Sequence, residues 1–190
     1  MEKLNNKFVT NGTKDHSFEI GRILIKGENH VRDIAKILNI NHMTVSRKVK
    51  ELVGKNVLDV KKEGRNKKYF LKKSVEARSF VLMEQQYFLI RLVQKHAFLR
   101  EIFNKIQQDK KVKLAMVFGS YAKGLERKES DVDIFAETKD IEIKKVYSKF
   151  DSKLSIKIGG FNLGEDLIKE ICKDNILIKG GEIYYEKVFG

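Results

Sequence analysis

Two short motifs place a glycine, a serine and two aspartates close together in the chain. Gly119-Ser120 follows an apolar run that ends at Phe118, and Asp131 and Asp133 stand two apart around the start of the next apolar run. Glycine lets the backbone approach a ligand, and the amides and hydroxyl that follow a strand can bind phosphate. Residues two apart on a strand project from one face, and paired carboxylates bind Mg²⁺ together with triphosphate oxygens. The pattern therefore predicts a Mg²⁺ and nucleotide site in which Asp131 and Asp133 are both the metal ligands and the catalytic residues.

The chemistry expected of such a site is nucleotidyl transfer. The metal would neutralise charge on the α-phosphate while a hydroxyl attacks and pyrophosphate leaves. Gly119, Ser120, Lys123 and Ser130 are the expected nucleotide-binding residues. An isolated Asp-x-Asp pair is otherwise typical of a solvated strand edge, so the prediction depends on the glycine and serine at the right distance.

The two motifs together resemble a known signature. Val117-Phe118-Gly119-Ser120, a spacer of ten residues and then Asp131-Val132-Asp133 are similar to the hydrophobic-Gly-Ser and Asp-x-Asp pattern of the DNA polymerase β nucleotidyltransferase superfamily. The match is closest to its minimal members, and the segment 176–185 resembles their closing segment, so the resemblance covers about residues 112–188. It implies transfer of a nucleoside monophosphate from an NTP, with ATP the expected nucleotide, to an acceptor that the sequence does not identify.

The resemblance also implies a third carboxylate on a later strand, and here the sequence departs from the pattern. The corresponding segment reads Leu154-Ser155-Ile156-Lys157-Ile158, in which the expected cleft-facing residues Ser155 and Lys157 are not acidic. Asp151 lies just upstream, and a lysine in this place could bind phosphate instead. Two hypotheses therefore remain open: a catalytic nucleotidyltransferase, or a non-catalytic transcription regulator whose second domain binds nucleotide or mediates assembly.

Alternating strand and helix patterns should position these residues. Strands are expected at 112–118, 132–136, 154–159 and, more weakly, 176–178, with helices near 140–150 and 165–173. This alternation predicts an α/β domain with a mixed sheet.

The first part of the chain has a different pattern. Apolar residues at helical spacing predict a helix over 30–39 capped by Asn29, a turn at 39–41 and a second helix over 42–53. A hairpin is expected from 57–60 and 67–71. The segment resembles winged helix-turn-helix transcription regulators, which implies double-stranded DNA as a partner, and an interaction module that does not touch nucleic acid is the alternative. The predicted DNA-binding residues are polar and basic side chains of the second helix and the wing: His42, Thr44, Ser46, Arg47, Lys48, Lys50, Arg65, Lys67 and Lys68.

The net charge also differs between the first part of the chain and the rest. The formal net charge is +13, and residues 1–75 hold 18 Lys and Arg against 8 Asp and Glu, while the remaining residues hold 21 against 18. A proteome rich in lysine would explain the total but not the asymmetry. The asymmetry favours a polyanion-binding module at the front of the chain.

These patterns predict an α+β protein of three parts. A winged helix-turn-helix domain is expected over 1–74, a connecting helical region over 75–110 and a minimal polymerase β-like nucleotidyltransferase domain over 111–190. The connecting region is rich in apolar residues, which fits either core between the domains or the interface of a homodimer.

Other features limit the classes of protein. Cys172 is the only cysteine, so an intrachain disulfide is excluded, and the four histidines have no metal-ligand spacing. No apolar run reaches the ~20 residues that cross a bilayer, and Met1-Glu2-Lys3 leads into polar sequence. We expect a cytoplasmic prokaryotic protein without a membrane partner.

Overall fold

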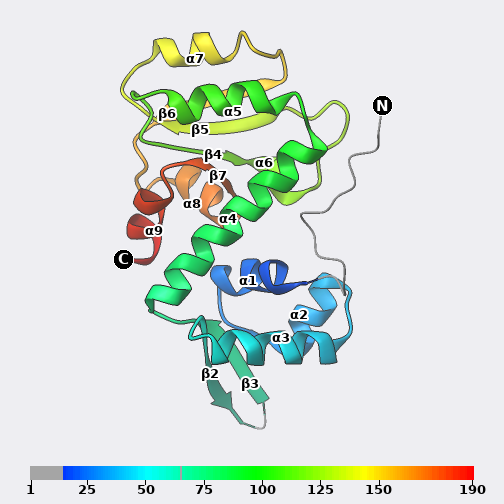
Figure 1. Ribbon diagram of the computed structural model, residues 1–190. Helices are drawn as coiled ribbons and strands as arrows, with labels where there is room; N and C mark the ends of the chain where they lie inside the picture. Colours follow the sequence, from blue (N-terminus) through cyan, green and yellow to red (C-terminus); the bar gives the residue numbers. More distant parts are fainter. Residues whose placement is uncertain (1–14, 65) are drawn as a thin grey trace. The chain divides into compact units, whose positions relative to one another are not determined.

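The computed structural model describes residues 15–64 and 66–190. The chain forms two units, Met1–Glu84 and Gln85–Gly190, and the division falls within the long helix α4, Val75–Lys95 (Figure 1). Each unit has a hydrophobic core of its own. Within the described part of the chain, no helix is both long enough and apolar enough to span a membrane.

The first unit has the topology of a winged helix. Its strands pair in the order β1-β3-β2, and both pairs are antiparallel. The hairpin β2–β3 is the wing. This arrangement confirms the winged helix-turn-helix expected from the sequence. The elements in chain order are α1 (Ser17–Lys26), β1 (Asn29–His30), α2 (Val31–Leu38), α3 (His42–Gly54), β2 (Leu58–Glu63) and β3 (Asn66–Leu71).

Local sequence explains the turn between α2 and α3. Asn39 ends α2 in the left-handed conformation with φ 51°, which asparagine tolerates better than most residues. Asn41 begins α3, because its side-chain oxygen accepts a hydrogen bond of 2.8 Å from the amide of Met43. The apolar faces of both helices then pack into the core of this unit, where Ile34, Val45 and Val49 are fully buried.

The second unit is built on a mixed four-stranded sheet in the order β6-β5-β4-β7. Strand β5 is antiparallel to β4 and parallel to β6, and β7 is antiparallel to β4. The mixed α/β sheet predicted for this part of the chain is therefore confirmed. The elements after α4 are α5 (Leu99–Gln108), β4 (Leu114–Phe118), α6 (Gly119–Lys123), β5 (Val132–Glu137), α7 (Glu142–Tyr147), β6 (Leu154–Gly159), α8 (Asp166–Lys173), β7 (Ile176–Lys179) and α9 (Gly181–Phe189).

Helices cover both faces of this sheet, as Figure 1 shows: α5 and α7 lie on one face and α8 and α9 on the other. Alternate residues of each strand enter the two cores. On β5, Val132, Ile134 and Ala136 belong to the core under α5 and α7, whereas Phe135 belongs to the core under α8 and α9. The strand therefore presents residues 133, 135 and 137 to the second face.

The structure corrects several details of the sequence analysis. Asn29 does not cap a helix but pairs with Tyr69 as part of β1, and the cap position of α2 is His30. The connecting helical region expected over 75–110 consists of two helices, because α4 ends at Lys95 and α5 begins at Leu99. Helix α7 is shorter than the expected 140–150. The strand expected at 176–178 is present as β7, and the helix α9 that follows it was not predicted.

Candidate functional site

The corner between β4 and β5 brings the glycine and one of the two aspartates together. Phe118, the last residue of β4, lies opposite Asp133 of β5 in the antiparallel register. Gly119 follows with φ +69°, and a Cβ atom added there would lie 2.6 Å from Asp133 Oδ2. The carboxylate of Asp133 is therefore packed directly against the backbone of Gly119, at a distance that no other residue type allows.

The remaining residues of the predicted nucleotide site surround this corner. Ser120 is half-buried in the first turn of α6, a helix of five residues. Asp131 is exposed and immediately precedes β5, whose first residue Val132 donates its amide to the carbonyl of Lys153 over 2.8 Å. Asp131 thus lies one residue before β5, and Asp133 is the second residue of this strand; that both side chains project from one face stays a prediction.

Two of the predicted nucleotide-binding residues already have partners in the protein. The ammonium of Lys123 lies 3.6 Å from Glu170 of α8. The hydroxyl of Ser130 accepts a hydrogen bond of 2.9 Å from the amide of Arg127, so it closes the turn that leads to Asp131.

The neighbouring strand β6 does not supply an acid at the corner. Ser155 lies opposite Asp133 in the parallel register and is half-buried, and Lys157 lies opposite Phe135 and is exposed. Among the described residues, no three His, Cys, Asp or Glu side chains are close enough to form a metal centre by themselves.

Asp151 lies at the same end of the sheet as Asp131. Its side chain is turned back on the loop before β6, where it accepts a hydrogen bond of 2.9 Å from the amide of Lys153. Burial raises the pKa of the Tyr121 phenol, and the negative charges of Glu126, Asp151 and Asp131 raise it further. Three carboxylates of this end of the sheet therefore act on one buried tyrosine of α6.

The predicted DNA-binding residues lie on α3 and the wing, and they differ in what they contact. His42, Arg47, Lys50 and Lys67 are exposed, and Thr44 and Ser46 are half-buried. Lys48 instead lies 3.1 Å from both Asp15 and Glu51, with 13% of its side chain exposed. Burial would lower the pKa of Lys48, but the hydrogen bonds to these two carboxylates hold it above its usual value. Lys68 contacts Glu63 at 3.0 Å, and Arg65 lies outside the described residues.

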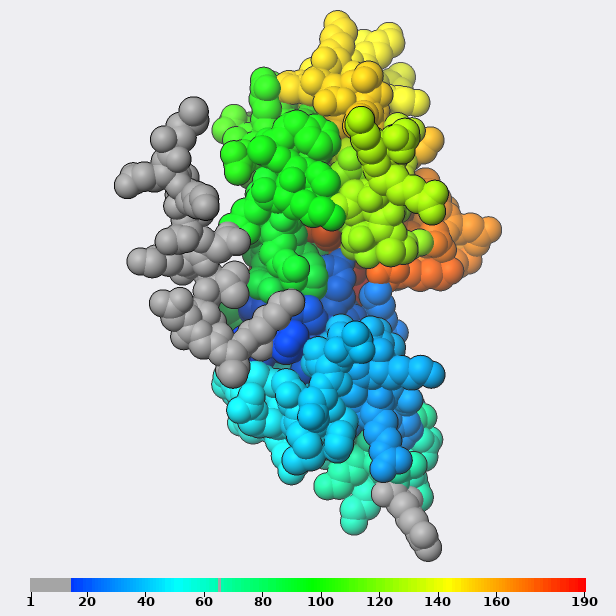
Figure 2. Space-filling model, turned by 90° about the vertical axis from the view of Figure 1, so that its right-hand side faces the viewer, coloured from blue at the N-terminus to red at the C-terminus, as the bar shows by residue number. Residues whose placement is uncertain are grey.

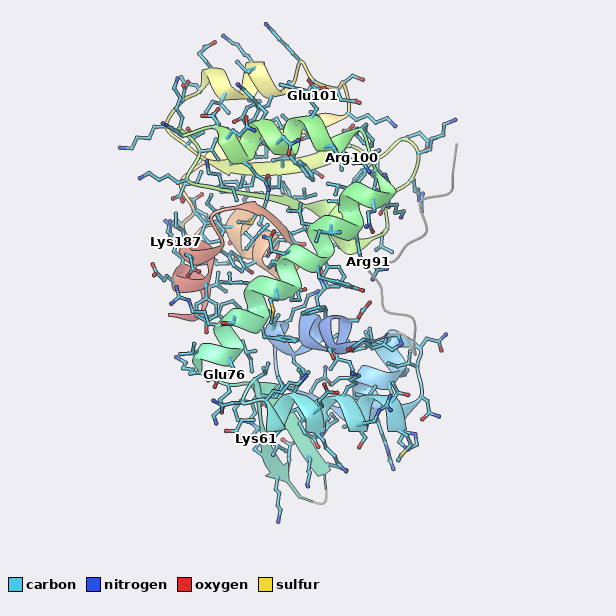
Figure 3. All side chains as sticks on the ribbon, in the orientation of Figure 1. Lys61, Glu76, Arg91, Arg100, Glu101 and Lys187 are labelled. Carbon is cyan, nitrogen blue, oxygen red and sulfur yellow. The ribbon has the colours of Figure 1, made fainter. Side chains whose placement is uncertain are left out.

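A groove separates the exposed side of α3 from the wing. Its walls are His42 and Ser46 of α3 and Asn66 and Lys67 of β3. Figure 2 shows α2 and α3 (blue to cyan) with the wing (teal) below them, and Lys61 of the wing is labelled in Figure 3. Sequence reasoning missed several residues that line this groove, because it assigned DNA contacts only to the second helix and to basic residues of the wing. The missed residues are His30 of β1, the start of α2 and two residues of β3: His30, Val31, Arg32, Asp33, Asn66 and Tyr69.

Comparison with known proteins identifies the second unit. Residues 100–184 match the family described as "Polymerase beta, Nucleotidyltransferase". The chain therefore contains a polymerase β nucleotidyltransferase domain. This domain includes α5 and extends into α9, so the match covers the whole sheet and the corner that holds Gly119 and Asp133.

Two solved structures are similar to the other part of the chain. One is the homodimeric winged helix-turn-helix DNA-binding domain of a "possible ArsR-family transcriptional regulator" from Mycobacterium bovis. The two chains are 25% identical with a TM-score of 0.34, and the match covers 37% of this chain. It covers 66% of the other chain, which is slightly less than two thirds of its length. The other is the adhesin competence repressor from Streptococcus pyogenes, at 26% identity and a TM-score of 0.33, over 53% of this chain and 78% of that one. No curated protein matches the chain. The strand order and pairing of the first unit are those of a winged helix, and residues 100–184 match the nucleotidyltransferase family model.

Proposed function

We propose that the protein binds double-stranded DNA through its winged helix and transfers a nucleoside monophosphate from Mg²⁺-bound ATP to a hydroxyl acceptor in its nucleotidyltransferase domain. The observation that carries the second half is the contact of Asp133 with Gly119. It joins the two motifs in one corner, where a phosphate that approaches the backbone of Gly119 also meets a carboxylate suited to bind its metal ion.

The residues of the corner fit a magnesium ion. Asp131 and Asp133 offer carboxylate oxygens at the start of β5, and the missing side chain of Gly119 lets the carboxylate of Asp133 lie against the backbone at which a phosphate would bind. When bound, Mg²⁺ would neutralise charge on the reacting phosphate. Gly119 and Ser120 would orient the triphosphate, and Lys123 would exchange its contact with Glu170 for a phosphate oxygen.

Catalysis at such a corner would come from positioning and charge. Ser155, which lies beside Asp133, is a poor base because its hydroxyl is neutral at ordinary pH. Holding the acceptor hydroxyl and the α-phosphate in line would still lower the barrier, since proximity alone can contribute several kcal/mol, roughly 7 to 11 in well-oriented cases.

The test of transfer is labelling by α-³²P-ATP. The full-length protein with Mg²⁺ should transfer label to itself or to an acceptor in added extract, and the double variant Asp131→Asn/Asp133→Asn should lose about 100-fold or more of this activity. Glu142→Gln, an exposed carboxylate of α7, is the matched control. Equal labelling by wild type and double variant would refute the assignment.

The test of DNA binding compares exposed and paired cations of one helix. Arg47→Ala and Lys50→Ala should each weaken binding to a duplex of about 20 base pairs and lower the slope of log Kd against log salt by about one phosphate contact. Lys48→Ala is the control, because its ammonium is held by Asp15 and Glu51. If Lys48→Ala changes the salt slope as much as Arg47→Ala does, the proposed DNA-facing side of α3 is wrong.

A second candidate function is supported by the register of β6. Ser155 stands beside Asp133 where an acid would be expected, and the exposed Lys157 follows on the same face. A site with two acids and a nearby cation can bind a nucleotide without turning it over. In that case the domain would act as a nucleotide sensor for a DNA-binding regulator.

A further inference from the structure

A buried carboxylate, Glu126, stands in the exposed loop between α6 and β5. Its side chain is 5% exposed, whereas Leu125 beside it is 71% exposed. Its Oε1 atom accepts a hydrogen bond from Lys95, the last residue of α4, and lies 2.8 Å from Nε2 of His96. The loop is therefore fastened to the end of α4 by a charged cluster that we call the Glu126 clasp: Lys95, His96 and Glu126.

The loop held by this clasp leads to Asp131. After Glu126 the chain makes a turn in which Arg127 and Ser130 exchange hydrogen bonds, and Lys153 donates to the carbonyl of Lys128 over 2.8 Å. Asp131 itself precedes β5 and is exposed. Since the strand ladder begins one residue later, the position of Asp131 depends on how this loop is held.

His96 also touches the other half of the corner. Its ring packs against the ring of Tyr121 with the centroids 4.9 Å apart, and Tyr121 belongs to α6, the helix that begins at Gly119. One residue therefore contacts both the helix of the glycine-serine motif and, through Glu126, the loop of the first aspartate.

Burying the carboxylate of Glu126 costs more free energy than a contact that only fixes a surface loop would require. Burial raises the pKa of Glu126, but the hydrogen bond from Lys95, a backbone hydrogen bond and His96 together bring it below its usual value. Its second oxygen, Oε2, is buried, and no hydrogen-bond partner for it exists among the described residues. Buried ion pairs contribute little net stability, yet losing one partner is disruptive, so such pairs are better suited to fixing a position than to adding stability.

We infer that Glu126 is a positioning residue for Asp131. By holding Asp131 in place, Glu126 sets the affinity of the proposed corner for its metal and nucleotide. The inference rests on the proposed function, because it assumes that Asp131 contacts the metal ion. Without the clasp, the loop would populate several conformations, and Asp131 would reach the metal in only a fraction of them, so the apparent affinity would fall by that fraction.

The experiment uses the full-length protein and two readouts. Hydrogen exchange of peptides covering 124–132 should accelerate about tenfold in Glu126→Gln, as expected for loss of a charge-assisted contact. The Mg²⁺ concentration for half-maximal binding of a fluorescent non-hydrolysable ATP analogue should rise by a similar factor. Lys95→Met removes one of the two side-chain partners of Glu126. Because the side chain of Lys95 is largely exposed, both readouts should change in the same direction but by a smaller factor. Glu142→Gln should change neither readout.

The outcomes separate this inference from the proposed function. Unchanged exchange in Glu126→Gln, or faster exchange with an unchanged Mg²⁺ requirement, overturns the role of Glu126 and leaves the proposed function standing. A wild-type protein that binds no analogue at any Mg²⁺ concentration overturns both. Should Glu126→Gln fail to fold, Lys95→Met decides the question by the same two criteria.

Discussion

At the scale of single residues, Gly119 and Gly124 form a natural pair for comparison. Both have φ +69°, a conformation that costs other residues about 1–2 kcal/mol. They differ in their surroundings: a Cβ at Gly119 would lie 2.6 Å from Asp133 Oδ2, and a Cβ at Gly124 would meet nothing within 4 Å. The backbone penalty is thus shared by the two positions, and the contact with the carboxylate is specific to one.

We therefore predict different results for two alanine substitutions. Gly124→Ala should lower the free energy of unfolding by about 1 kcal/mol and leave the binding of the Mg²⁺-bound ATP analogue unchanged. Gly119→Ala should lower it further and also weaken analogue binding roughly tenfold, because the new methyl group displaces the carboxylate of Asp133. Thermal unfolding and analogue titration measure both quantities. Equal analogue affinity in the two variants would show that the contact at Gly119 has no role in binding.

At the scale of elements, the sequence predicted those parts whose signals are local. Asn41 at the start of α3 is such a signal, and so are the two apolar strands that enclose the corner of Gly119 and Asp133. The strand β1 could not be predicted, because its two residues are defined only by pairing with Tyr69 and Lys68 of β3. The end of α4 was also missed, since Lys95 and His96 are held by Glu126, a residue 30 positions away from His96 in the chain.

The same limit applies to the candidate site. The spacing of Asp131 and Asp133 indicated a shared face, and Gly119-Ser120 indicated a turn after a strand. The alternation of the segment 154–158 indicated that Ser155 and Lys157 share a face, but the register that places Ser155 beside Asp133 was not predicted. The sequence could not show that Lys48 and Lys68 form ion pairs, because their partners come from other segments. Lys48 pairs with Asp15, and Lys68 pairs with Glu28 and Glu63.

The junction of α5, α7 and β7 gives a prediction about pH. The hydroxyl of Tyr147 on α7 donates to Asp109 Oδ2 over 2.8 Å, and Lys179 of β7 donates to the carbonyl of Asp109. Burial would raise the pKa of Asp109, but the bond from Tyr147 and the amide of Lys111 bring it below its usual value. Burial and the same carboxylate raise the pKa of Tyr147 far above that of a free tyrosine.

The signs of these two shifts define a window of stability. The lowered pKa of Asp109 stabilises the fold above the unfolded value of about 4, and this contribution is lost as pH falls through the lower folded pKa. The raised pKa of Tyr147 stabilises the fold below about pH 10, and this contribution is lost as pH rises further. Tyr147→Phe should therefore cost about 1 kcal/mol near pH 7 and less at both extremes. Urea unfolding between about pH 3 and pH 11 would measure this, with Tyr185→Phe as the control; a cost that does not vary with pH would contradict the prediction.

At the scale of the whole molecule, the two proposed activities belong to separate units of one chain. The proposed DNA-binding residues lie between His42 and Lys68, in the unit that ends at Glu84, and the corner of Gly119 and Asp133 lies in the unit that follows. The excess of positive charge is concentrated in residues 1–75. Binding of duplex DNA should accordingly depend steeply on salt, and the salt slope should not depend on the state of the nucleotide corner.

This separation allows one measurement to decide between the two candidate functions. A ligand changes the affinity for a second ligand only if it binds two conformations of the protein differently, and the effect is then reciprocal. A transferase that uses its winged helix for location needs no such coupling, so the Mg²⁺-bound ATP analogue should change the Kd for a duplex by less than about twofold. A sensor requires coupling of about fivefold or more, with the same factor in the affinity for the analogue when DNA is present. The titration is made at one fixed salt concentration, and the double variant Asp131→Asn/Asp133→Asn shows whether any effect arises at the corner. A coupling above fivefold that the double variant abolishes, together with no consumption of ATP, would replace the transferase by the sensor.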